Sequence, residues 1–299
     1  MERRPFHIGK SPCQGAGKGG TFPQPDQPVV IAMPDNQSLE NEPLLLRSDE
    51  DGITTLTLNR GNKFNALSSE LMTTVQSELD AIAGDTSVRV VIIAGAGKAF
   101  CAGHDLKEMD ADPEADTIRA LFAQCSRMMV TLTQLPQPVI ARVHGIATAA
   151  GCQMVAQCDL AVAADHVTFA TSGINVGLFC GTPSVAVTRN LPRKQALEML
   201  LTGEFIDAET ALQYGLVNRV VPADQLDDAV MALARRIARQ GPAFIANGKR
   251  LFYRQLEQGL EAAYELGTEC MVDNMQMKEA RDGLKAFISK SPMPEWPDR

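Results

Sequence analysis

The feature that most constrains this fold is a repeated pattern in which an apolar run of strand length ends in small residues and leads into a helix-like segment. The run at 88–94 is rich in β-branched residues, as expected of a strand buried on both faces, and small residues follow it at 102–103. The run at 138–143 leads into a second small-residue cluster at 147–151, and 160–164 starts the pattern again. Strands that alternate with helices in this way predict an α/β domain built on parallel strands.

Hydrophobic periodicity and turn residues predict the remaining elements. A β-hairpin is expected from 44–47 and 53–59, because Asp51-Gly52 between the two runs is a strong hairpin signal. A helix is expected over 69–83, where one apolar stripe repeats at helical spacing. A short polar helix follows at 107–110. The last third is predicted to be helical, in segments 194–201, 207–214, 223–240, 243–256 and 260–290.

The N-terminal stretch differs from the rest in composition. Residues 1–40 are rich in glycine and proline and have little periodic hydrophobicity, so we expect them to be disordered. Met33 lies just before the periodic pattern begins, which suggests the hypothesis that translation starts there. The predicted organisation is therefore a disordered extension at 1–40, an α/β core at 41–222 and a helical region at 223–299.

Charge and cysteine content exclude several classes of function. The net charge is −8 and no basic run is interleaved with aromatic residues, so a nucleic-acid partner is not expected. No apolar run approaches the roughly 18 to 20 residues of a membrane span. The seven cysteines include no Cys-x-x-Cys pair and no histidine at ligand spacing, so no metal site is predicted. These features predict a soluble protein of a reducing compartment, with a cytoplasmic location in a bacterium preferred over a mitochondrial one.

The small-residue turn at 149–151 allows two interpretations. A strand that passes through such a turn into a helix leaves N–H groups without intrahelical partners, and these groups can hold an oxygen that gains negative charge. Alternatively, Ala149, Ala150 and Gly151 only allow the helix to pack closely on the sheet. The turn alone does not decide between a binding site and plain packing.

Several stretches occur in order along about residues 44–290. They are Asn65-Ala66-Leu67, Lys98-Ala99-Phe100, Ala102-Gly103-His104-Asp105-Leu106, Gly145, Ala150-Gly151-Cys152, Cys158-Asp159, Phe169 to Gly177, Leu201-Thr202-Gly203 and Gly215-Leu216-Val217. Together they resemble the crotonase superfamily, the enoyl-CoA hydratases and isomerases. The run that begins at Gly173 further resembles the enoyl-CoA hydratase domain-containing protein 3 branch of that superfamily.

The resemblance implies a spiral of ββα units with a C-terminal helical region that trimerises, and a homotrimer or a hexamer made of two trimers. It implies an acyl-CoA thioester partner, a lyase or isomerase type of activity in fatty acid metabolism, and no cofactor, since CoA enters with the substrate. The thioester oxygen would be held by the backbone N–H groups of His104 and Ala150, and Ala150 must then adopt angles that a Cβ tolerates. The substrate-binding positions carried over are Asn65, Ala66, Leu67, Gly103, Asp105, Leu106 and Gly151.

The chain departs from the hydratase pattern at both catalytic glutamates. The resemblance places these at Gln153 and Gly173, and neither residue is an acid or base. Efficient hydration by the usual mechanism is therefore not expected. Replacement candidates are His104, Asp105, Glu108, Cys152 and Cys180, each of which is also explained by capping, surface exposure or core packing. Thr171, Ser172 and Asn175 can hydrogen-bond a substrate, whereas Asp159, His144 and His166 are better explained as structural groups.

Three functions remain open from the sequence. The first is an acyl-CoA enzyme in which two backbone amides do most of the work, as a slow hydratase, isomerase, thioesterase or decarboxylase. The second is a non-catalytic acyl-CoA-binding or regulatory protein, which the residues at 153 and 173 favour. The third, a purely structural role as a trimeric partner, gives no reason for a turn that is open to a ligand.

Overall fold

The computed structural model describes residues 42–296, which belong to a unit that begins at Glu42. The predictions of disorder at 1–40 and of a start at Met33 lie outside the described residues. The predicted hairpin is confirmed: β1 (Leu45–Glu50) pairs antiparallel with β2 (Ile53–Leu58). Its turn residues, Asp51 and Gly52, both have positive φ, 51° and 76°, as a two-residue turn between twisted strands requires.

The larger sheet gives the fold its core. Within the described residues it has six strands in the order β1-β2-β3-β5-β7-β10. The added strands are β3 (Val90–Gly95), β5 (Val139–Val143), β7 (Leu160–Ala164) and β10 (Arg219–Val221). From β2 onward every neighbouring pair is parallel. All of β3 is buried, which explains why its sequence is a continuous apolar run.

A second, smaller sheet contains the strands that follow β3, β5 and β7 in the chain. Its order in the described region is β4-β6-β8-β9. These strands are β4 (Ala99–Cys101), β6 (Ile146–Thr148), β8 (Thr168–Ala170) and β9 (Ile206–Asp207). β3 is followed by β4, β5 by β6 and β7 by β8, and a helix follows each pair. This is the predicted spiral of ββα units, and it brings successive strand-to-helix turns to neighbouring strands of the small sheet.

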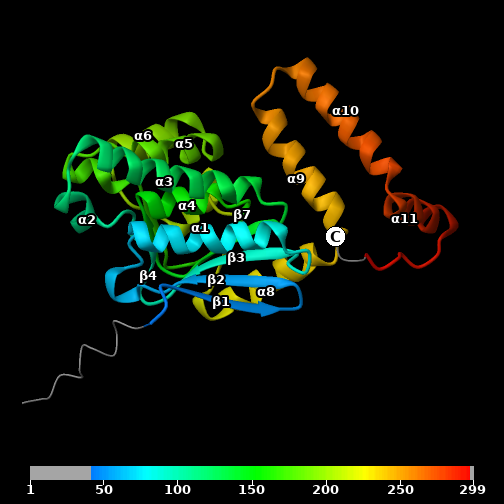
Figure 1. The fold of residues 1–299 in the computed structure, drawn as a ribbon, viewed down its shortest axis with the longest axis horizontal. Coiled ribbons are helices and arrows are strands. Elements are labelled where there is room, and N and C mark those ends of the chain that lie inside the picture. The colour runs from blue at the N-terminus through cyan, green and yellow to red at the C-terminus, as the bar shows by residue number, and fades with distance from the viewer. Residues whose placement is uncertain (1–41, 297–299) are drawn as a thin grey trace, which may run out of the picture. The chain divides into compact units, whose positions relative to one another are not determined.

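Helices cover the large sheet on both sides. Figure 1 shows α1, α3 and α4 above the sheet in that view and α8 below it. The helices of the core are α1 (Ser69–Gly84), α2 (Leu106–Ala111), α3 (Ala115–Gln134), α4 (Ala150–Gln157), α5 (Gly181–Asn190), α6 (Arg193–Thr202), α7 (Ala208–Tyr214) and α8 (Leu226–Ala238). Short 3-10 turns are η2 (Gly61–Lys63), η3 (Ser172–Val176) and η4 (Ala223–Gln225). The helix α8 packs on β2, β3, β5 and β7 and so covers the sheet, although it lies beyond the predicted boundary at residue 222. The division of the chain at residue 222 stays a prediction.

The C-terminal region is helical, with one break that the sequence did not indicate. It consists of α9 (Pro242–Leu256), α10 (Leu260–Gln276) and α11 (Lys278–Ser289), and Figure 1 shows α9 and α10 as neighbouring helices. The predicted single helix over 260–290 is therefore wrong, because Met277 adopts an extended conformation with ψ 138°. Two core helices, α3 and α5, were also not predicted.

A largely buried polar cluster holds α9 to the core. It consists of Asp159, Lys249 and Tyr253, and we call it the Asp159 cluster. The Asp159 carboxylate accepts hydrogen bonds from Lys249 Nζ at 2.6 Å, the Tyr253 hydroxyl at 2.8 Å and the Val139 amide at 2.6 Å. Lys249 Nζ also donates to the Leu132 and Gln137 carbonyls at 2.8 and 2.9 Å. The prediction that Asp159 is a structural group is confirmed, and its partner is Lys249.

Candidate functional site

The first strand-to-helix turn presents the backbone of His104. Gly103 has φ 96°, a conformation that favours glycine, and its carbonyl accepts the Leu67 amide at 2.8 Å. The Asp105 amide donates to the Leu67 carbonyl at 3.0 Å. In such a parallel bridge the residue between these two contacts directs its own N–H away from Leu67. The His104 N–H has no acceptor among residues 42–296.

The second turn presents the backbone of Ala150. Ala150 is the first residue of α4, so its N–H has no intrahelical acceptor, and no other acceptor lies in the described part of the chain. The strained residue is its neighbour: Ala149 has φ 49° and ψ −119°, which a Cβ tolerates poorly. Ala150 is not among the described residues with positive φ. The expected difficulty at Ala150 is therefore found at Ala149.

The two turns meet because small residues let their backbones approach. A Cβ on Gly103 would lie 2.9 Å from the Ala149 Cβ and 3.3 Å from the Ala150 nitrogen. A Cβ on Gly151 would lie 2.0 Å from the Cys101 carbonyl oxygen, so glycine there is required for α4 to pack on β4. The packing interpretation therefore holds for Gly151. The amides of His104 and Ala150 have no partner in the described region, and the interpretation that they hold an oxygen stays a prediction.

A cavity of about 340 Å³ lies at these two amides, and we call it the turn cavity. Its walls include His104, Ala149 and Ala150 from the two turns. Two neighbouring N–H groups at one cavity can stabilise an oxygen that gains negative charge, since they need no reorganisation when the charge develops. This arrangement suits a thioester carbonyl or an enolate.

The His104 side chain is largely buried and packs edge-on against Phe122, with ring centroids 5.0 Å apart. Burial lowers the pKa of the imidazole to about 4, although Glu108 nearby acts in the opposite direction. Its Nε2 is buried and has no partner within residues 42–296. His104 is therefore neutral at pH 7, which argues against a role as a general acid.

The two positions to which the resemblance assigns glutamates differ in structure. Gln153 is buried in α4, three residues after Ala150 on the same helix face, and its Oε1 has no hydrogen-bond partner in the described region. Gly173 lines the turn cavity, but a Cβ there would lie 2.5 Å from the Leu178 carbonyl oxygen and 2.8 Å from Cys180 Sγ. Position 153 already holds a side chain of the same length as glutamate, whereas any side chain at position 173 would meet the Leu178 carbonyl and Cys180.

The segment expected to bind substrate at 65–67 is engaged in holding the first turn. The Asn65 side chain is fully buried; its Oδ1 accepts the Arg60 amide at 2.9 Å and its Nδ2 donates to the Ala96 and Ala99 carbonyls, both at 2.8 Å. The Ala66 carbonyl accepts from the Arg60 guanidinium, and both backbone groups of Leu67 bond to the first turn. These contacts position the turn and leave the Asn65 amide no free hydrogen-bonding group for a ligand.

Asp105 and Leu106 occupy different environments. Asp105 caps α2 and pairs with Arg60 at 3.0 Å. Burial raises the pKa of its carboxyl, but the bonds from Arg60 and from the Lys107 amide outweigh burial and lower the pKa overall. Leu106 is exposed and lines the turn cavity. Asp105 therefore has a structural role, whereas Leu106 can touch a ligand.

Most other candidates are explained by structural contacts. The Glu108 carboxylate accepts the Ser69 amide at 2.9 Å and so caps α1. Burial raises the pKa of Cys152 to about 12, and that of Cys180 also rises, so neither thiol is activated. The remaining polar candidates also make internal hydrogen bonds: Thr171 to the Met199 carbonyl, Ser172 to Thr148, Asn175 to the Gly203 carbonyl, and His144 to the Gly97 carbonyl; His166 pairs with Asp165 at 3.5 Å.

Sequence reasoning missed the apolar wall of the turn cavity. Met109 comes from α2 and Phe122 from α3, while Leu178 and Phe179 come from the segment before α5. A signal for α3 existed, because Leu121, Cys125, Met128 and Leu132 form a buried stripe at helical spacing. No local pattern shows that Phe122, beside that stripe, faces the His104 ring.

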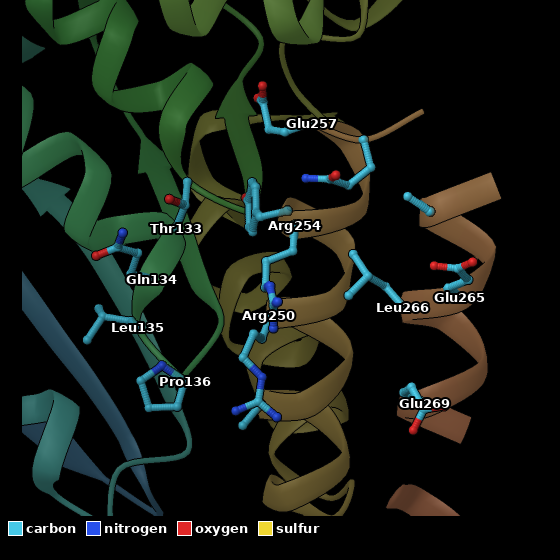
Figure 2. Close-up of a pocket in the computed structure, with 14 residues that line it drawn as sticks. Thr133, Gln134, Leu135, Pro136, Arg250, Arg254, Glu257, Glu265, Leu266 and Glu269 are labelled. Carbon is cyan, nitrogen blue, oxygen red and sulfur yellow. The ribbon is translucent and has the colours of Figure 1, made fainter. Parts of the chain in front are cut away.

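A larger hollow of about 1000 Å³ lies elsewhere, between α9, α10 and residues 133–136. Figure 2 shows Arg250 and Arg254 between the Thr133–Pro136 segment and Leu266 of α10. None of the described residues predicted for the site lines it. The described chain also contains no group of three potential metal ligands, and none of its helices has the length and apolar character to cross a bilayer.

Comparison with known proteins identifies the family. Residues 48–299 match the enoyl-CoA hydratase/isomerase family, so the chain belongs to it. A Xenopus laevis protein, mitochondrial enoyl-CoA hydratase domain-containing protein 3, is 46% identical over 258 residues, which cover 86% of this chain and 87% of that protein. The predicted resemblance to the crotonase superfamily and to this branch is confirmed.

Solved structures agree. An enoyl-CoA hydratase from Mycobacterium smegmatis is 54% identical, with TM-score 0.84, over 85% of this chain and 99% of that one. Human enoyl coenzyme A hydratase domain-containing protein 3 is 43% identical, with TM-score 0.82, over 84% of this chain and 100% of that one. The predicted crotonase-type fold is confirmed by these likenesses; trimerisation stays a prediction.

The comparison corrects the predicted location. Domain-containing protein 3 relatives from Xenopus laevis, Rattus norvegicus, Danio rerio, Mus musculus and Homo sapiens are all named mitochondrial. The preference for the cytoplasm over the mitochondrion is therefore wrong. Net charge and cysteine spacing carry no information that separates these two reducing compartments.

Proposed function

We propose that this chain binds an acyl-CoA thioester and polarises its carbonyl between the N–H groups of His104 and Ala150. The observation that carries the proposal is the pair of turns whose unpartnered amides meet at one cavity. Membership of the enoyl-CoA hydratase/isomerase family supports the thioester as ligand. Removal of one such donor typically costs about 10² to 10³ in rate, so two can support chemistry on the carbon next to the thioester.

Efficient hydration is not part of the proposal. Addition of water needs a positioned acid and base, and the resemblance assigns these roles to positions 153 and 173. Gln153 has no useful basicity, Gly173 has no side chain, and the neutral His104 is a poor substitute. Loss of one positioned acid or base typically costs about 10² to 10⁴ in rate.

The carbonyl itself reports on this proposal. Butyryl-CoA labelled with ¹³C at the carbonyl would be bound to the protein and its C=O stretch measured by isotope-edited infrared spectroscopy. Hydrogen bonds from two amides weaken the bond, so we expect a lower frequency than in water. A frequency equal to that in water, with binding shown by calorimetry, would contradict carbonyl polarisation.

Ala150→Pro supplies the matching variant. Proline is accepted at the first position of a helix, and it removes the N–H that the proposal requires. We expect a smaller frequency shift and weaker butyryl-CoA binding. Circular dichroism and thermal unfolding check that α4 is intact, so a lost shift in an unfolded variant is not counted as support.

A second candidate, a non-catalytic acyl-CoA-binding protein, is favoured by the closed space at Gly173. The two candidates differ in turnover. Crotonyl-CoA and 3-enoyl-CoA substrates would be followed at high enzyme concentration for hydration and double-bond migration. Turnover that is lost in Ala150→Pro supports an enzyme, whereas tight binding with no turnover above background supports a binding protein.

We also infer that the chain forms a homotrimer, or a hexamer of two trimers, through its C-terminal helices. Large apolar side chains are exposed there, with Tyr264 72% and Phe287 76% accessible. Such exposure on α10 and α11 favours contact with another copy. A monomer mass by light scattering at micromolar concentration would refute this. The names of the relatives support a mitochondrial location, and a cofactor beyond substrate CoA is not expected.

A further inference from the structure

Most side chains that line the turn cavity are apolar. Leu106, Met109 and Phe122 come from α2 and α3, and Val176, Leu178 and Phe179 come from the end of η3 and the segment before α5. The cavity lining thus combines the residues that carry the two unpartnered N–H groups with apolar side chains from two stretches of the chain.

The cavity lining carries no formal charge. None of the described residues that line it is Lys, Arg, Asp or Glu, and burial keeps His104 neutral at pH 7. Besides His104, the polar side chains in the wall are Ser172, Cys180 and Thr182. The Ser172 hydroxyl lies 2.6 Å from that of Thr148, and Cys180 Sγ accepts the Gly173 amide at 3.3 Å. A charged group brought into this space would lose hydration without gaining a counter-charge.

Apolar surface at the cavity is left uncovered. Leu106 is 58% exposed, Val176 68% and Phe179 45%. A hydrocarbon chain that leaves the two amides along these walls would remove apolar surface of both partners from water, which favours binding. A volume of about 340 Å³ has room for roughly ten groups of about 30 Å³ each, the size of a water molecule.

We propose that this cavity selects acyl-CoA thioesters with an uncharged hydrocarbon tail of medium length and rejects those that end in a carboxylate. The inference rests on the proposed function, because the thioester must be held at the two amides for its tail to lie along these walls. It goes beyond that function in assigning Val176, Leu178 and Phe179 as determinants of tail specificity.

Isothermal titration of the full-length protein tests the proposal with hexanoyl-CoA and adipyl-CoA, which have equal length and differ in the terminal carboxylate. We expect hexanoyl-CoA to bind at least about tenfold more tightly. In the series butyryl-, hexanoyl- and octanoyl-CoA, Kd should fall by up to about fourfold per methylene, the equivalent of about 0.8 kcal/mol for a fully buried group.

Val176→Arg tests the assignment of the wall. Val176 is largely exposed, so the change should leave folding intact, and it places a cation where the tail is expected to lie. We expect weaker hexanoyl-CoA binding and tighter adipyl-CoA binding, so that the preference narrows or reverses. Val185→Arg is the matched control: Val185 is 52% exposed on α5 and does not line the cavity, so the preference should remain.

The outcomes separate the two proposals. If none of these thioesters binds, the proposed function is wrong and the inference falls with it. If they bind but adipyl-CoA equals hexanoyl-CoA, or Kd does not depend on tail length, the tail inference is wrong while the proposed function stands. If the preference for hexanoyl-CoA over adipyl-CoA changes equally in Val176→Arg and Val185→Arg, these wall residues do not determine tail specificity.

Discussion

Two buried polar regions of this protein are built in opposite ways. In the Asp159 cluster the carboxylate accepts three hydrogen bonds and the Lys249 ammonium donates three. At the turn cavity, within the described residues, the amides of His104 and Ala150 and the His104 Nε2 have no partners. Buried polar groups are usually satisfied, so the difference separates a region that holds the fold from the region at which we propose that a ligand binds.

The largest effect is expected from breaking the satisfied region. Lys249→Met leaves Asp159 buried without its counter-charge, so we expect a loss of about 3 to 5 kcal/mol in the free energy of unfolding. Chemical denaturation measures this loss. Lys278→Met is the control, because Lys278 pairs with Asp282 on the surface and its loss should leave the midpoint unchanged. Equal effects of the two variants would contradict the structural role of the cluster.

The next effect tests the unsatisfied region through pH. The pKa of His104 falls from 6.5 in the unfolded chain to about 4 in the folded protein, so only the unfolded chain takes up a proton between these values. Stability is therefore unaffected by His104 above about pH 6.5 and falls as the pH drops toward 4, by up to about 3 kcal/mol.

His104→Phe isolates this contribution, since phenylalanine can pack on Phe122 and does not titrate. Urea unfolding of both proteins at pH 7.5, 5.5 and 4.5 should show the wild type losing more stability than the variant. Parallel curves would mean that the imidazole is hydrated in the folded protein and that its nitrogen is not an unsatisfied group.

A smaller effect distinguishes the two glutamate positions. Gly173→Ala introduces a Cβ that would meet the Leu178 carbonyl, so we expect a loss of about 1 to 3 kcal/mol from overpacking. Gly248→Ala is the matched control, because a Cβ there meets nothing within 4 Å inside α9, and it should stabilise by about 1 kcal/mol. If Gly173→Ala is neutral, position 173 is open and a glutamate could be restored there.

The same comparison shows what the sequence could predict. The Asp51-Gly52 hairpin and the strands at 139–143 and 160–164 follow from local patterns, and the structure has the two strands at these residues. Contacts between distant segments were not predictable: Lys249 reaches Asp159 across 90 positions, and Glu108 caps Ser69 across 39. The helix α5 was missed because glycine, proline and β-branched residues make it a poor helix by propensity.

The site was predicted at the level of the backbone and missed at the level of its walls. Small residues at 103 and 149–151 mark close backbone approach, which a sequence records directly. The closing of position 173 by Leu178 and Cys180 depends on the path of a short loop, and the apolar wall depends on the rotation of α3. Neither the path of this loop nor the rotation of α3 can be read from the hydrophobic periodicity of the local sequence.

The smallest effect is expected at Ala149, the strained residue of the second turn. Ala149 has φ 49° and ψ −119°, angles that glycine adopts at low cost, so Ala149→Gly should stabilise the protein. Relief of about 1 to 3 kcal/mol of strain is offset by about 0.5 to 1 kcal/mol of added freedom in the unfolded chain, which leaves a gain near 1 kcal/mol. Ala156→Gly inside α4 is the control and should destabilise by about 1 kcal/mol. If both variants destabilise the protein alike, Ala149 is not strained. In that case the fold does not have to hold Ala149 in an unfavourable conformation in order to orient the Ala150 amide.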